Sequence, residues 1–248
     1  MTAPVLSLHE VSKSYPLADG AFHALRDVRF DVHEGEMVAL MGPSGSGKST
    51  LMNVLGLLDR PSDGRYVLRG RDVAELSESE RADVRNAEIG FVFQAFHLLP
   101  RFSLLENVEV PMVYAGVPGP ERRARAMHVL ERVGLADKAT SLPSRISGGQ
   151  KQRAAVARAL AMEPALLLAD EPTGNLDSQT GHEIMALFHD LNAEGSTLII
   201  VTHEVDIAEQ TGRQIHLLDG VVERDERGAP IVPEPVRVRL RAARSVAA

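Results

Sequence analysis

The sequence predicts an α/β fold built around a mostly parallel sheet, and two observations lead to this prediction. Four short apolar runs have the composition of strands that are buried on both faces, as they are in parallel sheets. Helical patterns separate these runs, which is the alternation expected when crossover helices join parallel strands. The four apolar runs are residues 37–41, 89–93, 166–169 and 198–201.

A second group of strands is predicted by the alternation of apolar and polar residues, which is typical of strands with one exposed face. Together these strands suggest a small antiparallel sheet that flanks the parallel one. They are residues 5–11, 28–32 and 65–69. Two short strands, 214–218 and 221–224, are also expected around the turn Asp219-Gly220. Ser77 and Glu80 have capping-box spacing, so a short helix is predicted over residues 77–86.

Between residues 95 and 161 the pattern changes from strands to helices. Ala126, Leu130 and Val133 would share one face of the middle helix of this region. We therefore expect a helical subdomain, at about residues 95–161, inserted into a domain that spans residues 1–228. The helices predicted here are 104–114, 121–133 and 150–161, and a fourth amphipathic helix is expected at 178–193.

The last segment, residues 229–248, differs in composition from the rest of the chain. It contains prolines at 230, 233 and 235, and its last fourteen residues hold four arginines and no acidic residue. An edge strand, a contact with a partner and a solvated tail all fit this composition. A solvated tail is the interpretation we favour.

The composition of the 248 residues is that of a globular protein, with 44% hydrophobic and 25% charged residues. The net charge of −7 argues against nucleic acid as the main partner, because phosphate backbones are bound by basic faces. The chain has no cysteine, which excludes disulfides and thiolate metal ligands and suits a cytoplasmic protein. The sequence lacks a signal peptide and any apolar run long enough to cross a bilayer. Work on membranes would therefore require another chain.

The strand predicted at residues 37–41 is followed by a glycine-rich loop and a helix. Gly42, Gly47, Lys48 and Ser49 have the spacing G-x-x-x-x-G-K-S of a phosphate-binding P-loop. Glycines let successive backbone N–H groups point at a phosphate, and the N-terminus of the next helix adds positive potential. Lys48 is expected to reach the β- and γ-phosphates, and the Ser49 hydroxyl to bind Mg²⁺. The residues expected around the phosphates are Gly42, Pro43, Ser44, Gly45, Ser46, Gly47, Lys48, Ser49 and Thr50.

Polar residues directly follow the other three buried strands. Ligands of open parallel sheets bind at the carboxyl ends of the strands, so we expect these residues to meet the P-loop at one place. They are Gln94, the pair Asp170-Glu171, and Thr202 with His203.

Each of these groups suits one part of phosphate chemistry. Asp170 would hold Mg²⁺, and Glu171 is placed to accept a proton from a water that attacks the γ-phosphate. The neutral amide of Gln94 could ligate the cation and orient the water. A lone histidine at a strand end, such as His203, is more often structural than catalytic, and only its neighbours raise its importance.

Two further features allow two interpretations each. Tyr15 is predicted in a polar loop, either as a partly buried aromatic or as a ring that stacks on adenine. Ser147, Gly148 and Gly149 lead directly into a helix, so they form either a second anion-binding helix N-terminus or a plain N-cap. Taken alone, these three residues favour the plain N-cap.

The motif S-G-G-Q at residues 147–150, followed by L-L-L-A-D-E-P at 166–172, resembles the ATP-binding-cassette (ABC) ATPases over roughly residues 5–225. The resemblance implies a head-to-tail dimer in which each ATP lies between the P-loop of one subunit and the signature motif of the other. It also implies that Tyr15 stacks on adenine, and that Gln94, Asp177 and His203 belong to the Q-loop, D-loop and switch. The signature residues would be Ser147, Gly148, Gly149 and Gln150.

A narrower similarity, in residues 92–100, 105–108 and 170–177, is to the lipoprotein-releasing, macrolide-exporting and cell-division branch (LolD-, MacB- and FtsE-like). It implies a subunit at the inner face of the cell membrane, bound to a separately encoded permease near residues 96–100. An ATPase that drives signalling or cell-envelope remodelling without transport remains the alternative. A soluble cassette of DNA repair or translation would be expected to carry coiled-coil insertions, a second cassette or a basic surface, and none is seen.

Overall fold

The computed structural model describes residues 3–18 and 20–230, so most of the predicted tail, residues 231–248, lies outside the described residues. The larger of its two sheets has the strand order β10-β9-β3-β8-β7-β6. Every neighbouring pair from β9 to β6 is parallel, and only β10 is antiparallel to its neighbour. These strands are β3 (Met37–Met41), β6 (Ile89–Phe93), β7 (Leu166–Asp170), β8 (Leu198–Val201), β9 (Arg213–Leu218) and β10 (Val221–Arg227). The prediction of a mostly parallel core sheet is confirmed.

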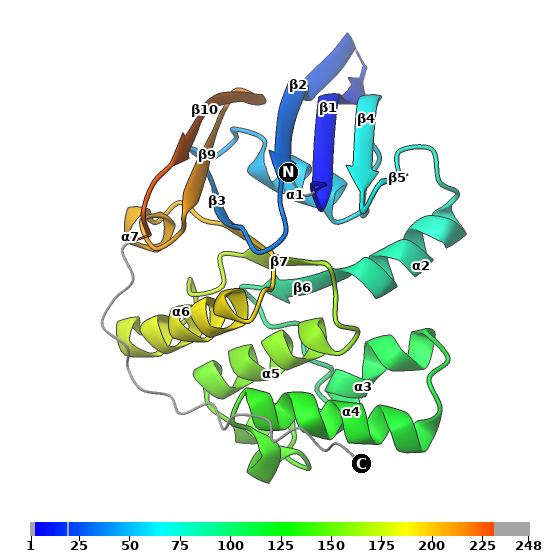
Figure 1. The fold of residues 1–248 in the computed structure, drawn as a ribbon, viewed down its shortest axis with the longest axis vertical. Helices are drawn as coiled ribbons and strands as arrows, with labels where there is room; N and C mark the ends of the chain where they lie inside the picture. The colour runs from blue at the N-terminus through cyan, green and yellow to red at the C-terminus, as the bar shows by residue number, and fades with distance from the viewer. Residues whose placement is uncertain (1–2, 19, 231–248) are drawn as a thin grey trace.

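The smaller sheet is antiparallel and has the order β2-β1-β4-β5. Figure 1 shows β1, β2 and β4 together beside the helix that follows β3. The strands are β1 (Leu6–Leu17), β2 (Gly20–Val32), β4 (Asp63–Leu68) and β5 (Arg71–Asp72). The flanking antiparallel sheet is therefore confirmed as well.

The hairpin of β1 and β2 is longer than the sequence predicts. Tyr15 lies inside β1 and pairs with Phe22 of β2, so its expected position in a loop is wrong. In the outer part of this hairpin, β2 is exposed at residues 20–23 and β1 is half-buried or exposed at residues 12–17. It therefore lacks the alternation of buried and exposed residues by which a half-buried strand is recognised.

Seven α-helices are described: α1 (Lys48–Leu55), α2 (Glu78–Glu88), α3 (Leu104–Tyr114), α4 (Gly119–Arg132), α5 (Gly148–Leu160), α6 (Ser178–Ala193) and α7 (Val205–Ala208). Helices α3, α4 and α5 lie together in the lower half of Figure 1, away from the antiparallel sheet. The predicted capping box of Ser77 and Glu80 opens α2, and matching boxes open α3 and α5. Helix α7 was not expected, because its four residues are too short for a periodic pattern.

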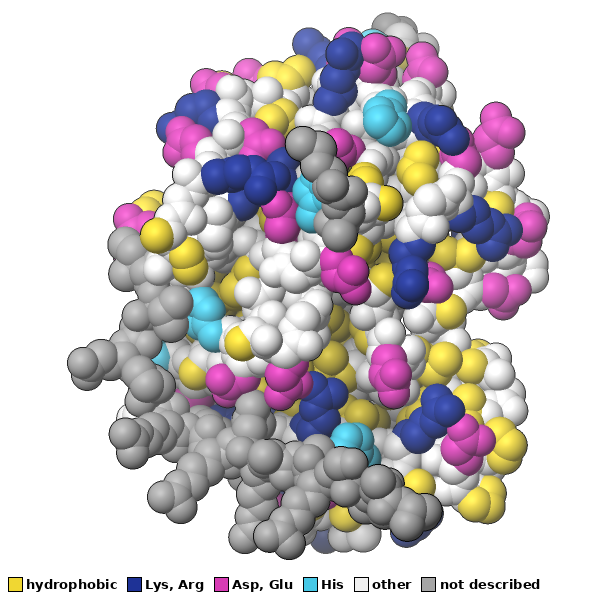
Figure 2. All heavy atoms as spheres, viewed as in Figure 1, with side chains coloured by type: hydrophobic (Ala, Val, Ile, Leu, Met, Phe, Trp, Pro, Cys, Tyr) yellow, Lys and Arg dark blue, Asp and Glu magenta, His cyan; other side chains and the backbone are white. Residues whose placement is uncertain are grey.

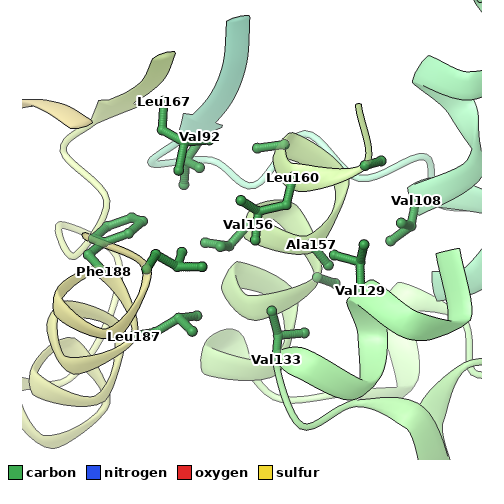
Figure 3. Close-up of a cluster of buried hydrophobic side chains, with 14 of the residues drawn as sticks. Val92, Val108, Val129, Val133, Val156, Ala157, Leu160, Leu167, Leu187 and Phe188 are labelled. Atoms are coloured by element: carbon green, nitrogen blue, oxygen red, sulfur yellow. The ribbon is translucent and has the colours of Figure 1, made fainter. Parts of the chain in front are cut away.

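Helix α5 joins the helical region to the parallel sheet through a continuous apolar core (Figure 3). In that view Val156 of α5 points toward Phe188 of α6, while Ala157 points toward Val129 of α4. Val92 of β6 and Leu167 of β7 bring the sheet into the same cluster, and both are essentially buried. A change in the position of α5 is therefore transmitted to the sheet, since close-packed side chains leave little room for independent movement.

The start of β9 is fixed by a buried arginine. The Arg213 guanidinium donates to the Asp31 carbonyl (2.6 Å), to Glu36 (3.0 Å) and to both carboxylate oxygens of Asp225 (2.7 and 2.6 Å). These bonds connect β9 with β10 and with the chain on either side of the β2–β3 turn. The hydrogen bonds from Arg213 hold the pKa of Asp225 below its ordinary value, although partial burial opposes this.

Replacing Arg213 by methionine is expected to lower the free energy of unfolding by about 2 kcal/mol, because the Asp225 carboxylate loses its hydrogen-bonded cation. Glu36 is left with its ion pair to the exposed Arg227. A depressed carboxylate pKa adds stability above the ordinary pKa of about 3.9, and this stability is lost as the pH falls through the lower, folded-state pKa. The difference between wild type and Arg213→Met should therefore be complete at neutral pH and shrink in acid.

Urea unfolding across pH measures this difference. The control is Arg224→Met, which removes an exposed ion pair with Glu226. An equal loss of unfolding free energy in the control would contradict the stabilising role of Arg213.

Candidate active site

The loop between β3 and α1 has a backbone that only glycine can supply at two positions. Gly42 and Gly47 have φ values of 147° and 105°. A Cβ atom added at Gly42 would lie 2.2 Å from the Leu217 carbonyl oxygen, and one at Gly47 would lie 2.7 Å from that of Ala24. The loop thus packs its backbone directly against β9 and β2, and Gly47 stands at the N-cap of α1. Its amide groups and the helix N-terminus form a site suited to an anion.

Lys48 closes this loop in the structure. Its ammonium donates to the carbonyl of Gly42 at 2.7 Å and to that of Pro43 at 2.9 Å. An ammonium has three donors, so one remains for a ligand while two hold the loop.

A cavity of about 600 Å³ opens beside the loop. Because β8 and β7 follow β3 in the sheet and run in the same direction, the residues after these strands reach the same cavity. The sequence-predicted residues that line it are Ser44, Gly45, Gly47, Lys48, Ser49, Thr50, Asp170, Glu171 and His203. Phe22, Ala24 and Val201 complete the lining.

The acidic pair is held at the cavity by β7. Burial raises the pKa of Asp170 above its ordinary value, and the Glu171 carboxylate raises it further, while Lys48 opposes both. Glu171 has a φ of 42°, a left-handed conformation that is uncommon for residues other than glycine. Its backbone N–H donates to the Val201 carbonyl at 2.9 Å, and its Oε1 lies 2.7 Å from Nδ1 of His203. The acidic pair and the histidine therefore form one polar cluster.

Gln94 follows β6, at the far edge of the parallel sheet, and is not among the residues that line the cavity. The Gln94 side-chain amide donates to Asn175 Oδ1 at 3.4 Å, and the backbone carbonyl of Gln94 accepts a bond of 2.9 Å from Asn175 Nδ2. The structure thus joins Gln94 to the loop after Glu171. Among the other predicted phosphate-loop residues, Gly42, Pro43 and Ser46 also do not line the cavity. Ser46 is buried, and its hydroxyl has no hydrogen-bond partner within residues 3–18 and 20–230.

The S-G-G-Q motif forms the N-terminus of α5, in the lower half of Figure 1, and does not line the cavity. Ser147 caps the helix: its hydroxyl accepts from the Gln150 N–H (3.3 Å), and Gln150 accepts from the Ser147 N–H (3.1 Å). A Cβ atom at Gly149 would lie 2.4 Å from Thr180, whose hydroxyl donates to Asp177, the N-cap of α6, at 2.6 Å. The two motifs therefore pack together, apart from the P-loop of the same chain.

Tyr15 is held from one side. Its hydroxyl donates to Asp59 at 2.8 Å, and the Lys13 ammonium lies 4.9 Å from its ring centroid and 2.6 Å from the same carboxylate. Burial alone would raise the pKa of Asp59, but the hydrogen bonds from Lys13, Tyr15 and the Arg60 backbone lower it below its ordinary value. Phe22, the cross-strand partner of Tyr15, lines the cavity, whereas Tyr15 does not. Phe22 carries no sequence motif, and only an extended β2 would have placed it opposite Tyr15.

The residues present fit a nucleotide with Mg²⁺. The glycine loop and α1 offer amide groups to phosphates, while the Ser49 hydroxyl and the Asp170 carboxylate supply the oxygen atoms that Mg²⁺ prefers. Few protein ligands suffice, since Mg²⁺ in such sites also takes phosphate oxygens and water.

A phosphate-binding loop with an acidic pair beside it on a parallel sheet defines the chain as a P-loop nucleotide-binding protein. Within that class, the chain belongs to the ABC transporter family, whose model matches residues 25–174. It is 50% identical over 93% of its length to the uncharacterized ABC transporter ATP-binding protein YknY of Bacillus subtilis, which it covers completely (100%). It is also 49% identical, over 92% of its length, to the macrolide export ATP-binding/permease protein MacB 1/2 of Paracoccus denitrificans, and it covers 34% of that protein.

Solved structures agree with this assignment. The dimeric ATP-binding cassette MJ0796, in a post-hydrolysis state with ADP and Pi, has a TM-score of 0.80 and 43% identity, covering 90% of this chain and 98% of its own. The cbiO1 protein of Clostridium perfringens, part of the ABC transporter complex cbiONQ, has a TM-score of 0.81 and 32% identity. The match covers 91% of this chain and 89% of cbiO1. The predicted family and fold are confirmed.

Proposed function

We propose that this chain is the ATP-binding and ATP-hydrolysing subunit of a membrane ABC transporter. The observation that carries the proposal is the single cavity of about 600 Å³, in which the P-loop residues, the acidic pair and His203 come together from three neighbouring parallel strands. In this proposal the loop amides and the free donor of Lys48 bind the phosphates. Ser49 and Asp170 hold Mg²⁺, which supplies charge stabilisation on the phosphates when it is bound.

Glu171 is proposed to accept the proton of the attacking water. Its contact of 2.7 Å with His203 supports this role, because that hydrogen bond orients the carboxylate. His203 is mostly exposed to the cavity side, so it can bond both to Glu171 and to the γ-phosphate. Gln94 is proposed to complete the site from β6, which requires its amide to leave Asn175 and turn toward the metal and water. Tyr15 is proposed to stack on the adenine.

The site is proposed to be completed by a second copy of the chain. Ser147, Gly148, Gly149 and Gln150 form an anion-binding helix N-terminus that lies apart from the chain's own cavity, and Asp177 packs beside it. A head-to-tail pair would bring each such helix end to the P-loop of the other copy, through an isologous interface. The dimeric state of the MJ0796 cassette supports this arrangement.

Replacing Ser147 by aspartate tests the composite site. Aspartate is a good N-cap, so α5 should remain intact, but its charge would face the phosphates of the other copy. The expected result is that the Kd for ATP of the monomer stays within about twofold, while the ATP-dependent dimer is lost and turnover falls on the order of 100-fold. Light scattering and phosphate release measure these effects. Ser103→Asp, at the matching cap of α3, is the control. Unchanged dimer formation in Ser147→Asp would refute the composite site.

The membrane partner is proposed to dock on the hollow between α2 and the helical region. This hollow, of about 630 Å³, is lined largely by apolar and aromatic side chains, among them Phe91 and Tyr114, and it includes His97 from the predicted coupling segment. Figure 2 shows it as a notch with hydrophobic side chains around it, on a face where acidic and basic groups are interspersed. Tyr114 is 82% exposed and adjoins the other apolar side chains of the hollow, so it adds to a contiguous apolar surface of the kind that partners cover.

No helix in the described part of the chain has the length and hydropathy needed to span a membrane. The relative from Paracoccus denitrificans favours a permease as the occupant of this hollow. That relative is an ATP-binding/permease protein, and this chain covers about a third of it. We infer a position at the inner face of the cell membrane. A tagged chain should retain an ABC permease in detergent; retention of ribosomes or DNA instead would contradict the inference.

A further inference from the structure

Phe22 is a large aromatic residue that the hairpin of β1 and β2 holds in an exposed position. Its side chain is 53% exposed, yet it lines the cavity together with Ala24 and the phosphate loop. A single exposed aromatic residue is common on protein surfaces, but a ring that lines a cavity offers apolar area that a ligand can cover. The role of Phe22 therefore depends on what the cavity binds.

The cavity has two chemically different sides. The phosphate loop with Lys48, and the polar residues that follow β7 and β8, supply charges and hydrogen-bond donors. Phe22 and Ala24, both from β2, supply an apolar wall. Of the parts of a nucleoside triphosphate, only the base has flat apolar faces. When the phosphates of a nucleotide bind in the loop, its base therefore fits the apolar wall formed by Phe22 and Ala24.

The hairpin also places two rings on one of its faces. Tyr15 and Phe22 are direct cross-strand partners, and such pairs have their Cβ atoms about 5 Å apart on the same side of the sheet. The two rings differ in freedom. The hydroxyl of Tyr15 is tied to Asp59, which fixes that ring near α1, whereas a phenyl ring has no polar group to anchor. Phe22 can therefore adjust to a ligand in a way that Tyr15 cannot.

We propose that Phe22 packs against the purine base of the bound nucleotide and sets the affinity for it. This inference rests on the proposed function, and it adds a base-binding residue to the ring of Tyr15. A phenyl ring recognises the base by its area and not by hydrogen bonds. The wall therefore favours purines over the smaller pyrimidines and contributes equally to adenine and guanine.

Calorimetric titration of the full chain with ATP, GTP, CTP and inorganic tripolyphosphate tests the proposal. In Phe22→Ala the Kd for ATP and for GTP should rise roughly tenfold, and the Kd for CTP by less. The Kd for tripolyphosphate, which has no base, should stay within about twofold. Phe22→Trp should restore ATP binding. Leu17→Ala is the matched control, because Leu17 is 62% exposed on the same hairpin and does not line the cavity.

The possible outcomes separate this inference from the proposed function. If wild type binds ATP and Phe22→Ala binds it equally well, Phe22 has no role and the inference fails, while the ATPase assignment stands. Equal losses of affinity for ATP and for tripolyphosphate in Phe22→Ala would also overturn the inference, since they would show damage to the phosphate loop. If wild type binds tripolyphosphate but gains nothing from the base of ATP, both the inference and the role of Tyr15 are overturned. A wild-type chain that binds no ATP would refute the proposed function itself.

Discussion

Replacement of Glu171 by glutamine is expected to reduce ATP turnover by roughly 10²- to 10⁴-fold while ATP binding is retained. Glutamine has the shape of glutamate, and its Oε1 can still meet His203, so the cavity should keep its form. It cannot take a proton from the attacking water, which is the role proposed for the carboxylate. Since hydrolysis is expected to reopen the dimer, the variant should accumulate as an ATP-bound pair.

Phosphate release and size-exclusion chromatography with light scattering measure turnover and the dimer in the same preparation. Glu163→Gln is the control, because Glu163 is an exposed carboxylate that shares the left-handed backbone of Glu171 but lies outside the cavity. Near-normal turnover in Glu171→Gln would remove Glu171 as the base. Loss of ATP binding in that variant would instead assign the carboxylate to nucleotide binding.

Replacement of Lys48 by alanine is expected to weaken ATP binding on the order of 100-fold or more, and turnover should be lost with it. The ammonium is proposed to make charge-assisted bonds to the β- and γ-phosphates, and truncating one partner of such a pair costs several kcal/mol. The substitution also removes the two bonds to Gly42 and Pro43 that close the loop. Both losses weaken the binding of ATP.

Equilibrium binding of ATP and of AMP separates the two contributions. AMP lacks the β- and γ-phosphates, so its weaker binding should change little if Lys48 acts through those groups. A large loss for both nucleotides would indicate that the loop itself has collapsed. Lys138→Ala, which removes a half-exposed lysine that pairs with its neighbour Asp137, controls for net charge. A Lys48→Ala protein that binds ATP tightly would undercut the P-loop assignment.

The elements that the sequence predicted well are those whose signal is local. The strand Met37–Met41 and the helix Ser178–Ala193 begin and end where their apolar patterns do. The capping box of Ser77 and Glu80 is satisfied within four residues of chain. The two apolar patterns depend on contacts with a sheet or core that any α/β fold provides, and the capping box is made within its own segment, so no knowledge of the particular neighbour was needed.

Tyr15 lies in a part of the chain that gives no local strand signal. The outer half of β1 lacks the apolar alternation of residues 5–11, because the hairpin there extends beyond the core and none of its residues 12–17 is fully buried. Pairing with β2 defines the strand there, and pairing is a contact between distant residues. The same register places Phe22 at the cavity, which no motif predicted.

The sequence by itself determined the chemistry at the end of each buried strand: the P-loop after β3, the acidic pair after β7 and His203 after β8. These groups follow their strands directly, and backbone geometry fixes such short distances along the chain. Only the tertiary structure decided which strands are neighbours, and hence that Glu171 meets His203 while Gln94 turns to Asn175. It also decided that the S-G-G-Q helix end lies away from its own P-loop. Strand order and hairpin register arise from packing across the whole core, which local spacing does not encode.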